Sequence, residues 1–321
     1  MDKENILEVH DLHVHYKTDT GIAKAVNGVS LTLAKGESLG LVGETGAGKT
    51  TTALAIMQLV PDPPGVIENG EIIFKGKNII YNTERENQEM RGDGISMISQ
   101  DPMTALNPVM TVGEQLTEVI LHHKKVSKKE AERMAKELME TVGVKADRFR
   151  DFPHQFSGGM KQRVIIAMAL LCRPEILIAD EPTTALDVTI QAQVLDLIRS
   201  LIKQYDMSML LITHDLGVVG EVCDRVAIMY AGEIVEEGSV LDVYTAPKHP
   251  YTQGLFDSLP DINSDENKKL IPIPGVAPNA TDIPSGCAFN PRCRYKQPIC
   301  EQPPPISGDG NHWCRCHFPL K

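Results

Sequence analysis

Short apolar runs alternate with longer amphipathic stretches over most of the chain. Apolar runs of about five residues, bounded by Gly, Asp or Pro, are typical of strands that helices bury on both faces. Such runs predict strands at 38–42, 95–99, 176–179, 209–213 and 225–229. Longer β-rich stretches of mixed polarity predict a half-exposed antiparallel edge sheet from strands at 6–16, 25–33 and 71–80.

A helix is predicted to begin after residue 127. Ser127 and Glu130 have the Ser-x-x-Glu spacing of a capping box, in which hydroxyl and carboxylate oxygens accept from backbone N–H groups at a helix start. Met134, Leu138 and Val142 then recur every four residues. We expect these three side chains to form the buried face of the helix.

The alternation of strands and helices predicts an α/β fold in two domains. Residues 1–259 form the first domain, with an antiparallel β edge subdomain, a helix with an apolar stripe at 190–201, and a helical insertion at about 101–160. Residues 260–321 hold more than half of the chain's 21 prolines and little apolar periodicity. This second domain is expected to be a loose tail or a small extension that a metal holds together.

Charge and hydropathy argue against a nucleic-acid-binding protein, a secreted protein and a protein that crosses a membrane by itself. Acidic residues outnumber basic ones by 43 to 32, which gives a formal net charge of −11. Such a surface repels phosphate backbones, so no nucleic-acid partner is expected. The first residues lack a basic segment followed by an apolar one, so no secretory signal is expected. The longest apolar runs are about half of the ~20 residues that span a bilayer.

A glycine-rich segment follows the predicted strand at 38–42. It consists of Gly43, Glu44, Thr45, Gly46, Ala47, Gly48, Lys49 and Thr50, and Thr51 opens the helical stretch after it. The spacing is G-x-x-x-x-G-K-[ST], the phosphate loop of nucleotide-binding proteins, in its required setting between a strand and a helix. Backbone N–H groups would surround the phosphates of ATP, Lys49 would reach the β- and γ-phosphates, and Thr50 would bind Mg²⁺.

Two acids end the predicted strand at 176–179. In a phosphate-loop protein such a strand lies beside the loop strand, so Asp180 is placed to hold Mg²⁺ through water. Glu181 is then placed to orient or deprotonate the attacking water. Without the phosphate loop, the default interpretation would be that these two acids simply end an ordinary strand.

A second anion site is predicted at a helix start. Ser157, Gly158, Gly159 and Met160 place a hydroxyl and several backbone N–H groups at the beginning of a helix. One nucleotide does not need two phosphate sites on one chain, whereas two chains packed head to tail would use both. A simple helix cap is the alternative.

These motifs together resemble the ATP-binding subunits of ABC transporters, over residues 6–259. The resemblance implies a P-loop NTPase core of ABC type and roles for four more residues. Tyr16 would stack on adenine, with a plain surface tyrosine as the alternative. Gln100 would sense Mg²⁺ and touch a transmembrane partner, Asp187 would lie at a dimer seam, and His214 would contact the γ-phosphate as a catalytic residue beside Glu181.

The resemblance narrows to the dipeptide and oligopeptide importers. It rests on the segments 152–163, 248–255 and 286–293, and on Met160, which stands where Gln is common in ABC proteins. It implies a subunit that hydrolyses ATP to power peptide uptake, bound peripherally at the cytoplasmic face of the membrane. The implied partners are a second ATP-binding subunit in a heterodimer, two permease subunits and an extracytoplasmic peptide-binding protein. Alternatives are a nickel importer of the same family, a soluble non-transport ABC ATPase, and a metabolic P-loop kinase.

Five of the seven cysteines fall in the last 35 residues. With no export signal, clustered thiols bind metals more often than they form disulfides. Cys287, Cys293, Cys300 and Cys316 are spaced C-x5-C-x6-C-x15-C, and four thiolates could hold either zinc or a [4Fe–4S] cluster. The resemblance to peptide importers favours the cluster on these four residues. Cys314 is then a spare, although it could exchange with Cys316 as the fourth ligand.

Overall fold

The structure is a computed structural model, and it describes residues 4–100, 105–184, 186–259 and 271–321. The chain forms two compact units, which are described separately. The described residues within 1–7, 33–38 and 74–212 make up unit 1, and those within 8–32, 39–73 and 213–321 make up unit 2.

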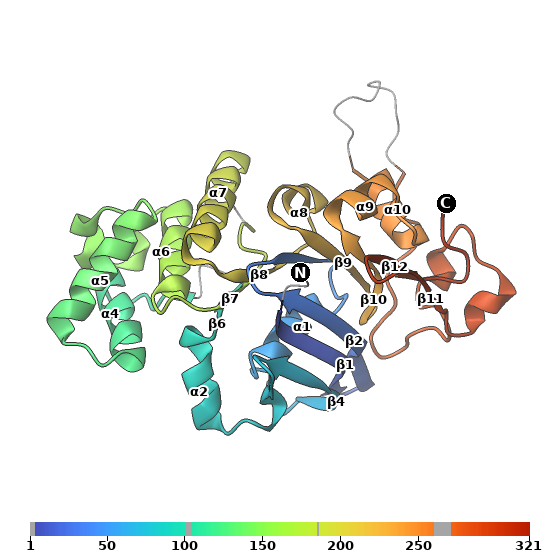
Figure 1. The fold of residues 1–321 in the computed structure, drawn as a ribbon, viewed down its shortest axis with the longest axis horizontal. Helices are drawn as coiled ribbons and strands as arrows, with labels where there is room; N and C mark the ends of the chain where they lie inside the picture. The colour runs from blue at the N-terminus through green and yellow to red at the C-terminus, as the bar shows by residue number, and fades with distance from the viewer. Residues whose placement is uncertain (1–3, 101–104, 185, 260–270) are drawn as a thin grey trace. The chain divides into compact units, whose positions relative to one another are not determined.

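Strands and helices alternate along the described ranges (Figure 1). The strands are β1 Asn5–Thr18, β2 Gly21–Ala34, β3 Ser38–Val42, β4 Gly65–Phe74, β5 Lys77–Asn78, β6 Ile95–Ile98, β7 Ile176–Asp180, β8 Ser208–Thr213, β9 Arg225–Tyr230, β10 Glu233–Ser239, β11 Ile306–Gly308 and β12 His312–Arg315. The helices are α1 Lys49–Ile56, α2 Glu84–Asp93, α4 Val112–His123, α5 Lys128–Thr141, α6 Gly158–Leu170, α7 Val188–Tyr205, α8 Leu216–Val222, α9 Val240–Thr245 and α10 Pro250–Asp257.

In unit 1, three buried strands form a parallel arrangement in the order β6, β7, β8. Every residue of β7 is buried, as expected for a strand covered on both faces. Helices α4, α5 and α6 pack against one another, and α4 and α5 lie within the range predicted to be a helical insertion (Figure 1). Residues 101–104, at the predicted start of that insertion, lie outside the described residues.

The prediction for α5 is partly wrong. Ser127 does cap the helix, because its Oγ accepts from the N–H of Glu130, but the Glu130 carboxylate pairs with Arg133 instead of completing a capping box. The buried face consists of Ala131, Ala135, Met139 and Val142, while Met134 and Leu138 are only half-buried. The prediction followed the largest side chains and passed over the two alanines that bring the helix close to its neighbours.

In unit 2, the strand that precedes the glycine-rich loop lies in an extended sheet. Strand β3 runs parallel to β9, and β10, β12 and β11 follow in antiparallel order. Strands from the cysteine-rich region therefore belong to the same sheet as β3. A second sheet contains β2, β1 and β4 in that order.

The predicted strand at 71–80 is wrong in its second half. Strand β4 ends at Phe74, because Lys75 and Gly76 both have positive φ angles, 52° and 78°, and turn the chain. Only Lys77–Asn78 is extended again, before a 3₁₀ turn over Ile79–Tyr81. Further 3₁₀ turns lie at Ala146–Arg150, Pro153–Gln155, Asn290–Arg292 and Pro298–Glu301. Within the described ranges, no helix has the length and apolar character needed to cross a bilayer.

Candidate functional site

The glycine-rich loop of unit 2 has a backbone that other residues could not adopt without strain. Gly48 has a φ of 105° and caps α1, and a Cβ there would lie 2.3 Å from the carbonyl oxygen of Ala25. A Cβ on Gly43 would lie 2.2 Å from the carbonyl oxygen of Met229. The loop therefore depends on glycine both for its turn and for its close approach to neighbouring strands.

Lys49 folds back over this loop. Its buried ammonium donates to the carbonyl oxygens of Gly43 and Glu44, at 2.7 and 3.1 Å. Thr50 and Thr51 follow in the first turn of α1, where backbone N–H groups have no partner within the helix. A cation, a helix start and a ring of loop amides in one place form an anion site of the kind that binds phosphates.

Glu44 is held from outside the loop. Its carboxylate forms a two-pronged ion pair with Arg292, with Nη1–Oε2 and Nη2–Oε1 distances of 2.6 and 3.0 Å. Its backbone N–H donates to the hydroxyl of Tyr251 at 3.0 Å. Neither Arg292 nor Tyr251 was a predicted site residue, and no local motif links them to the loop.

Two more predicted residues belong to unit 2. Tyr16 is half-buried, and its ring packs on Gly65, where a Cβ would lie 2.7 Å from the ring carbon Cε1. His214 is exposed and lies between the end of β8 and Asp215, which caps α8. Stacking of Tyr16 on adenine and contact of His214 with a phosphate remain predictions.

In unit 1, the two acids at the end of β7 have different surroundings. Asp180 is the last, buried residue of the strand. Glu181 follows with a φ of 45°, and its Oε2 accepts from Nε2 of Gln100 at 3.2 Å and from Oγ1 of Thr184 at 2.9 Å. The structure thus brings the predicted residues Gln100 and Glu181 together and orients the carboxylate by two hydrogen bonds.

The predicted second anion site lies at the exposed start of α6. Ser157 caps the helix by accepting from the N–H of Met160 at 3.4 Å. A Cβ on Gly159 would lie 2.8 Å from Cγ2 of Ile190, so this glycine lets α7 approach α6. Asp187 caps α7 by accepting from the N–H of Ile190 at 3.0 Å and is exposed. Ser157 and Asp187 therefore cap helices and remain exposed to solvent.

The four predicted metal ligands line one cavity in unit 2. Cys287, Cys293, Cys300 and Cys316 all contribute to its wall, together with His249 and Phe289. Cys314 is fully buried within β12 and is not part of this wall.

Three of these thiols accept a hydrogen bond from the backbone N–H two residues further on. Phe289 donates to Cys287, Tyr295 donates to Cys293 at 3.4 Å, and Phe318 donates to Cys316 at 3.3 Å. Burial raises the pKa of Cys287 to about 11 and also raises the pKa values of Cys293 and Cys316. Thiolates in this cavity would therefore require a compensating cation.

His249 lines the same cavity. The side chain is 1% exposed, and its Nδ1 accepts from the N–H of Tyr251 at 3.0 Å, which places the ring proton on Nε2. Burial lowers the pKa of His249 to about 3, so the ring is neutral. Nε2 has no hydrogen-bond partner among the described residues. A buried donor without an acceptor is costly unless the cavity holds one.

Comparisons with known proteins identify the family. The ABC transporter family model matches residues 26–184, and the model of the oligopeptide/dipeptide transporter C-terminal region matches residues 235–300. The oligopeptide transport ATP-binding protein OppD of Bacillus subtilis is 53% identical over 94% of this chain and 85% of its own length. The chain belongs to the ATP-binding subunits of the oligopeptide/dipeptide ABC transporter family. It is therefore an ATPase, as the sequence predicted.

A further relative and a solved structure support the same family and fold. The dipeptide transport ATP-binding protein DppD of Bacillus subtilis is 50% identical, over 93% of this chain and 90% of its own length. Among solved structures, the dimeric ATP-binding cassette MJ0796, in a post-hydrolysis state bound to ADP and Pi, superposes with a TM-score of 0.66 and 26% identity. That match covers 73% of this chain and 98% of the other. The ABC cassette fold predicted from the sequence is thereby confirmed.

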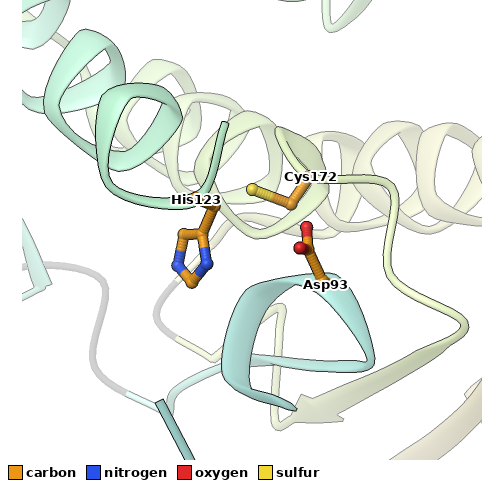
Figure 2. A group of neighbouring side chains, drawn as sticks. All are labelled: Asp93, His123 and Cys172. Atoms are coloured by element: carbon orange, nitrogen blue, oxygen red, sulfur yellow. The ribbon is translucent and has the colours of Figure 1, made fainter. Parts of the chain in front are cut away.

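Three further polar side chains meet in unit 1 of this ATP-binding subunit. Asp93 at the end of α2, His123 at the end of α4 and Cys172 after α6 have ligand atoms within 4.8 Å of one another (Figure 2). Burial, reinforced by Asp93, raises the pKa of Cys172 to about 11, so the protonated thiol donates to the carboxylate. Burial also lowers the pKa of His123. These contacts tie three helix ends together, and a metal ion would first have to displace the thiol proton.

Proposed function

We propose that this ATP-binding subunit powers the import of dipeptides or oligopeptides across the cytoplasmic membrane. The observation that carries the proposal is the match of residues 235–300 to the oligopeptide/dipeptide transporter C-terminal region. This region lies outside the general cassette match at 26–184, and relatives that align with 93–94% of this chain are named for oligopeptide and dipeptide transport. The cassette motifs explain ATP hydrolysis, and the C-terminal region distinguishes this subgroup from other ATPases.

In the proposed mechanism, catalysis consists of positioning and charge neutralisation. The loop from Gly43 to Thr51 binds the phosphates through its amides and Lys49. Thr50, Gln100 and Asp180 are the residues that would hold Mg²⁺, which would neutralise phosphate charge when bound. Glu181 acts on the attacking water, which is supported by the two hydrogen bonds that orient its carboxylate. His214 contacts the γ-phosphate.

The active assembly contains more than this chain. A second ATP-binding subunit packs head to tail, so that Ser157, Gly158, Gly159 and Met160 close over the partner's ATP and Asp187 lies at the seam. The exposure of Ser157, Gly158 and Asp187 supports this arrangement. Two permease subunits and an extracytoplasmic peptide-binding protein complete the transporter. The chain then lies peripherally at the cytoplasmic face of the membrane.

Uptake measurements test the transport function. A strain that lacks this chain should lose growth on a di- or tripeptide as sole source of a required amino acid, while growth on the free amino acid is retained. Expression of the chain should restore growth on peptides, and expression of Lys49→Ala should not. Unchanged peptide uptake together with lost nickel uptake would contradict the proposal.

The cofactor of the C-terminal region is proposed to be a [4Fe–4S] cluster on Cys287, Cys293, Cys300 and Cys316. The backbone N–H groups donated to three of these thiols, and the presence of His249 in the same cavity wall, support a bound group with several sulfur acceptors. When bound, the cluster would cross-link a segment with too little apolar content to fold alone.

Metal analysis tests the cofactor. Protein purified without oxygen should be brown and contain about four irons and four sulfides per chain, as the cluster formula requires. Stoichiometric zinc without acid-labile sulfide in the same preparation would contradict the cluster and leave the cysteine site as a zinc site.

A further inference from the structure

The cysteine-rich segment reaches the phosphate loop through one arginine. Arg292 lies in the 3₁₀ turn next to Cys293 and is 7% exposed. Its Nε donates to the carbonyl oxygen of Pro274 at 2.9 Å, and its Nη1 donates to the hydroxyl of Tyr230 at 3.2 Å. Residues outside the loop therefore fix the guanidinium in the position from which it pairs with the Glu44 carboxylate.

Every polar group of Glu44 has a hydrogen-bond partner. Its carbonyl oxygen accepts from Lys49 and from the N–H of Ala47, and its own N–H donates to Tyr251. Arg292 takes both carboxylate oxygens. The conformation of the second residue of the phosphate loop is thus set by the loop lysine on one side and by the C-terminal segment on the other.

The residues that hold Glu44 lie next to residues of the cysteine cavity. Cys293, which follows Arg292, lines that cavity, as does His249, two residues before Tyr251. The ring of Phe289, also in the cavity wall, packs against Tyr230 and Tyr251 with centroid distances of 5.3 and 5.4 Å. The wall of the cavity and the support of Glu44 are therefore one packed structure.

We propose that Arg292 is a positioning residue for the phosphate loop, and that through it the C-terminal segment sets the ATP affinity of this chain. The inference goes beyond peptide transport, because it concerns nucleotide binding by the isolated subunit, and it holds for any occupant of the cavity. A carboxylate in a loop that binds phosphates repels them unless a cation neutralises it. A buried two-pronged arginine does so and also fixes the geometry, which a lysine cannot do equally well.

Binding measurements on the full chain test this inference. The affinity for Mg²⁺-ATP is measured by calorimetry for Arg292→Ala and for the matched control Arg294→Ala, which removes an arginine on the other side of Cys293 that pairs with Asp257. Arg292→Ala should weaken binding about tenfold, the size expected for a charge-assisted pair. Arg294→Ala should change binding by less than about twofold. Melting temperature and iron content are recorded for each variant.

The decisive comparison repeats Arg292→Ala in a Glu44→Gln background. If the arginine acts by neutralising and holding Glu44, its loss should cost less than about twofold there. An equal loss in both backgrounds, or no loss in either, would overturn the proposal. If Arg292→Ala does not fold, Arg292→Lys in the same two backgrounds makes the same comparison, with an expected loss of about threefold against the native Glu44.

Discussion

Gln100 donates a hydrogen bond from Nε2 to Oε2 of Glu181, at 3.2 Å. The two residues are 81 positions apart and follow neighbouring parallel strands, β6 and β7, at the same edge. A second donor, the hydroxyl of Thr184, binds the same oxygen. The carboxylate proposed to act on water is thus oriented by two hydrogen bonds from the protein, and the residue proposed to sense Mg²⁺ supplies one of them.

Glu181→Gln should retain ATP binding and lose hydrolysis. The amide keeps the size of the side chain but cannot accept a proton from water, so single-turnover cleavage at this chain's site should fall by at least about a hundredfold. Rapid-quench measurement of ATP held at the Lys49 site in the assembled transporter checks this. Because a partner subunit could contribute its own turnover, an unchanged single-turnover rate at this site is the contradicting result.

Lys49→Ala and Ser157→Arg should separate the two anion sites. Lys49 serves the loop of its own chain, so its loss should weaken ATP binding by the isolated subunit at least about tenfold. Ser157 is proposed to serve the partner's nucleotide, so Ser157→Arg should leave binding by the isolated subunit intact and abolish hydrolysis in the assembly. Loss of ATP binding by isolated Ser157→Arg would contradict the head-to-tail arrangement.

Gly159→Ala should destabilise the chain more than Gly158→Ala. A Cβ at 159 would lie 2.8 Å from Cγ2 of Ile190, a stiff branched side chain, whereas at 158 the nearest atom is 4.0 Å away on Leu186. Overpacking of this kind costs about 1–3 kcal/mol, and an alanine in open space costs less than about 0.5 kcal/mol. Chemical denaturation of both variants checks the difference. Equal stabilities would show that α7 can move away without cost.

Cys316→Ala and Cys314→Ala should differ in iron content. Cys316 lines the cavity and Cys314 does not, although the two are separated by one residue. Cys316→Ala should lose most of the iron and the visible absorbance, while Cys314→Ala should keep both and lose some stability, because it opens a small void within the sheet. Iron retained in Cys316→Ala and lost in Cys314→Ala would assign the fourth ligand to Cys314.

Much of the fold follows from patterns that are local in the sequence. The strand at 38–42 has the predicted bounds, and the other four predicted buried strands agree within one residue at each end. The phosphate loop is a contiguous motif, so its residues were predictable in advance. The four cysteines were selected partly by resemblance, and the cavity brings together those four. The predicted domain boundary stays a prediction, since residues 260–270 lie outside the described ranges, as does Ala185 beside the predicted seam.

What the sequence could not supply are the long-range pairings. Arg292 and Glu44 are 248 residues apart, and although Glu44 was predicted as part of the phosphate loop, nothing in either segment indicates that the two side chains pair. His249 belongs to a segment that carried the family resemblance, yet nothing in that segment indicates that it lines the same cavity as the four cysteines. Strands β11 and β12 have three and four residues, too short for an alternating pattern to show.

The pairing of β12 with β10 means that the cassette cannot be treated as a module that ends where the ATPase motifs end. Glu236 in β10 is fully buried and accepts from Nε2 of His312 in β12 at 2.8 Å. A chain cut at residue 259 would bare the long edge of β10 and leave that carboxylate without its histidine. Bare edges recruit other strands. Truncation should therefore yield an aggregating fragment instead of a smaller ATPase. The extension supplies the strands that complete this edge of the sheet.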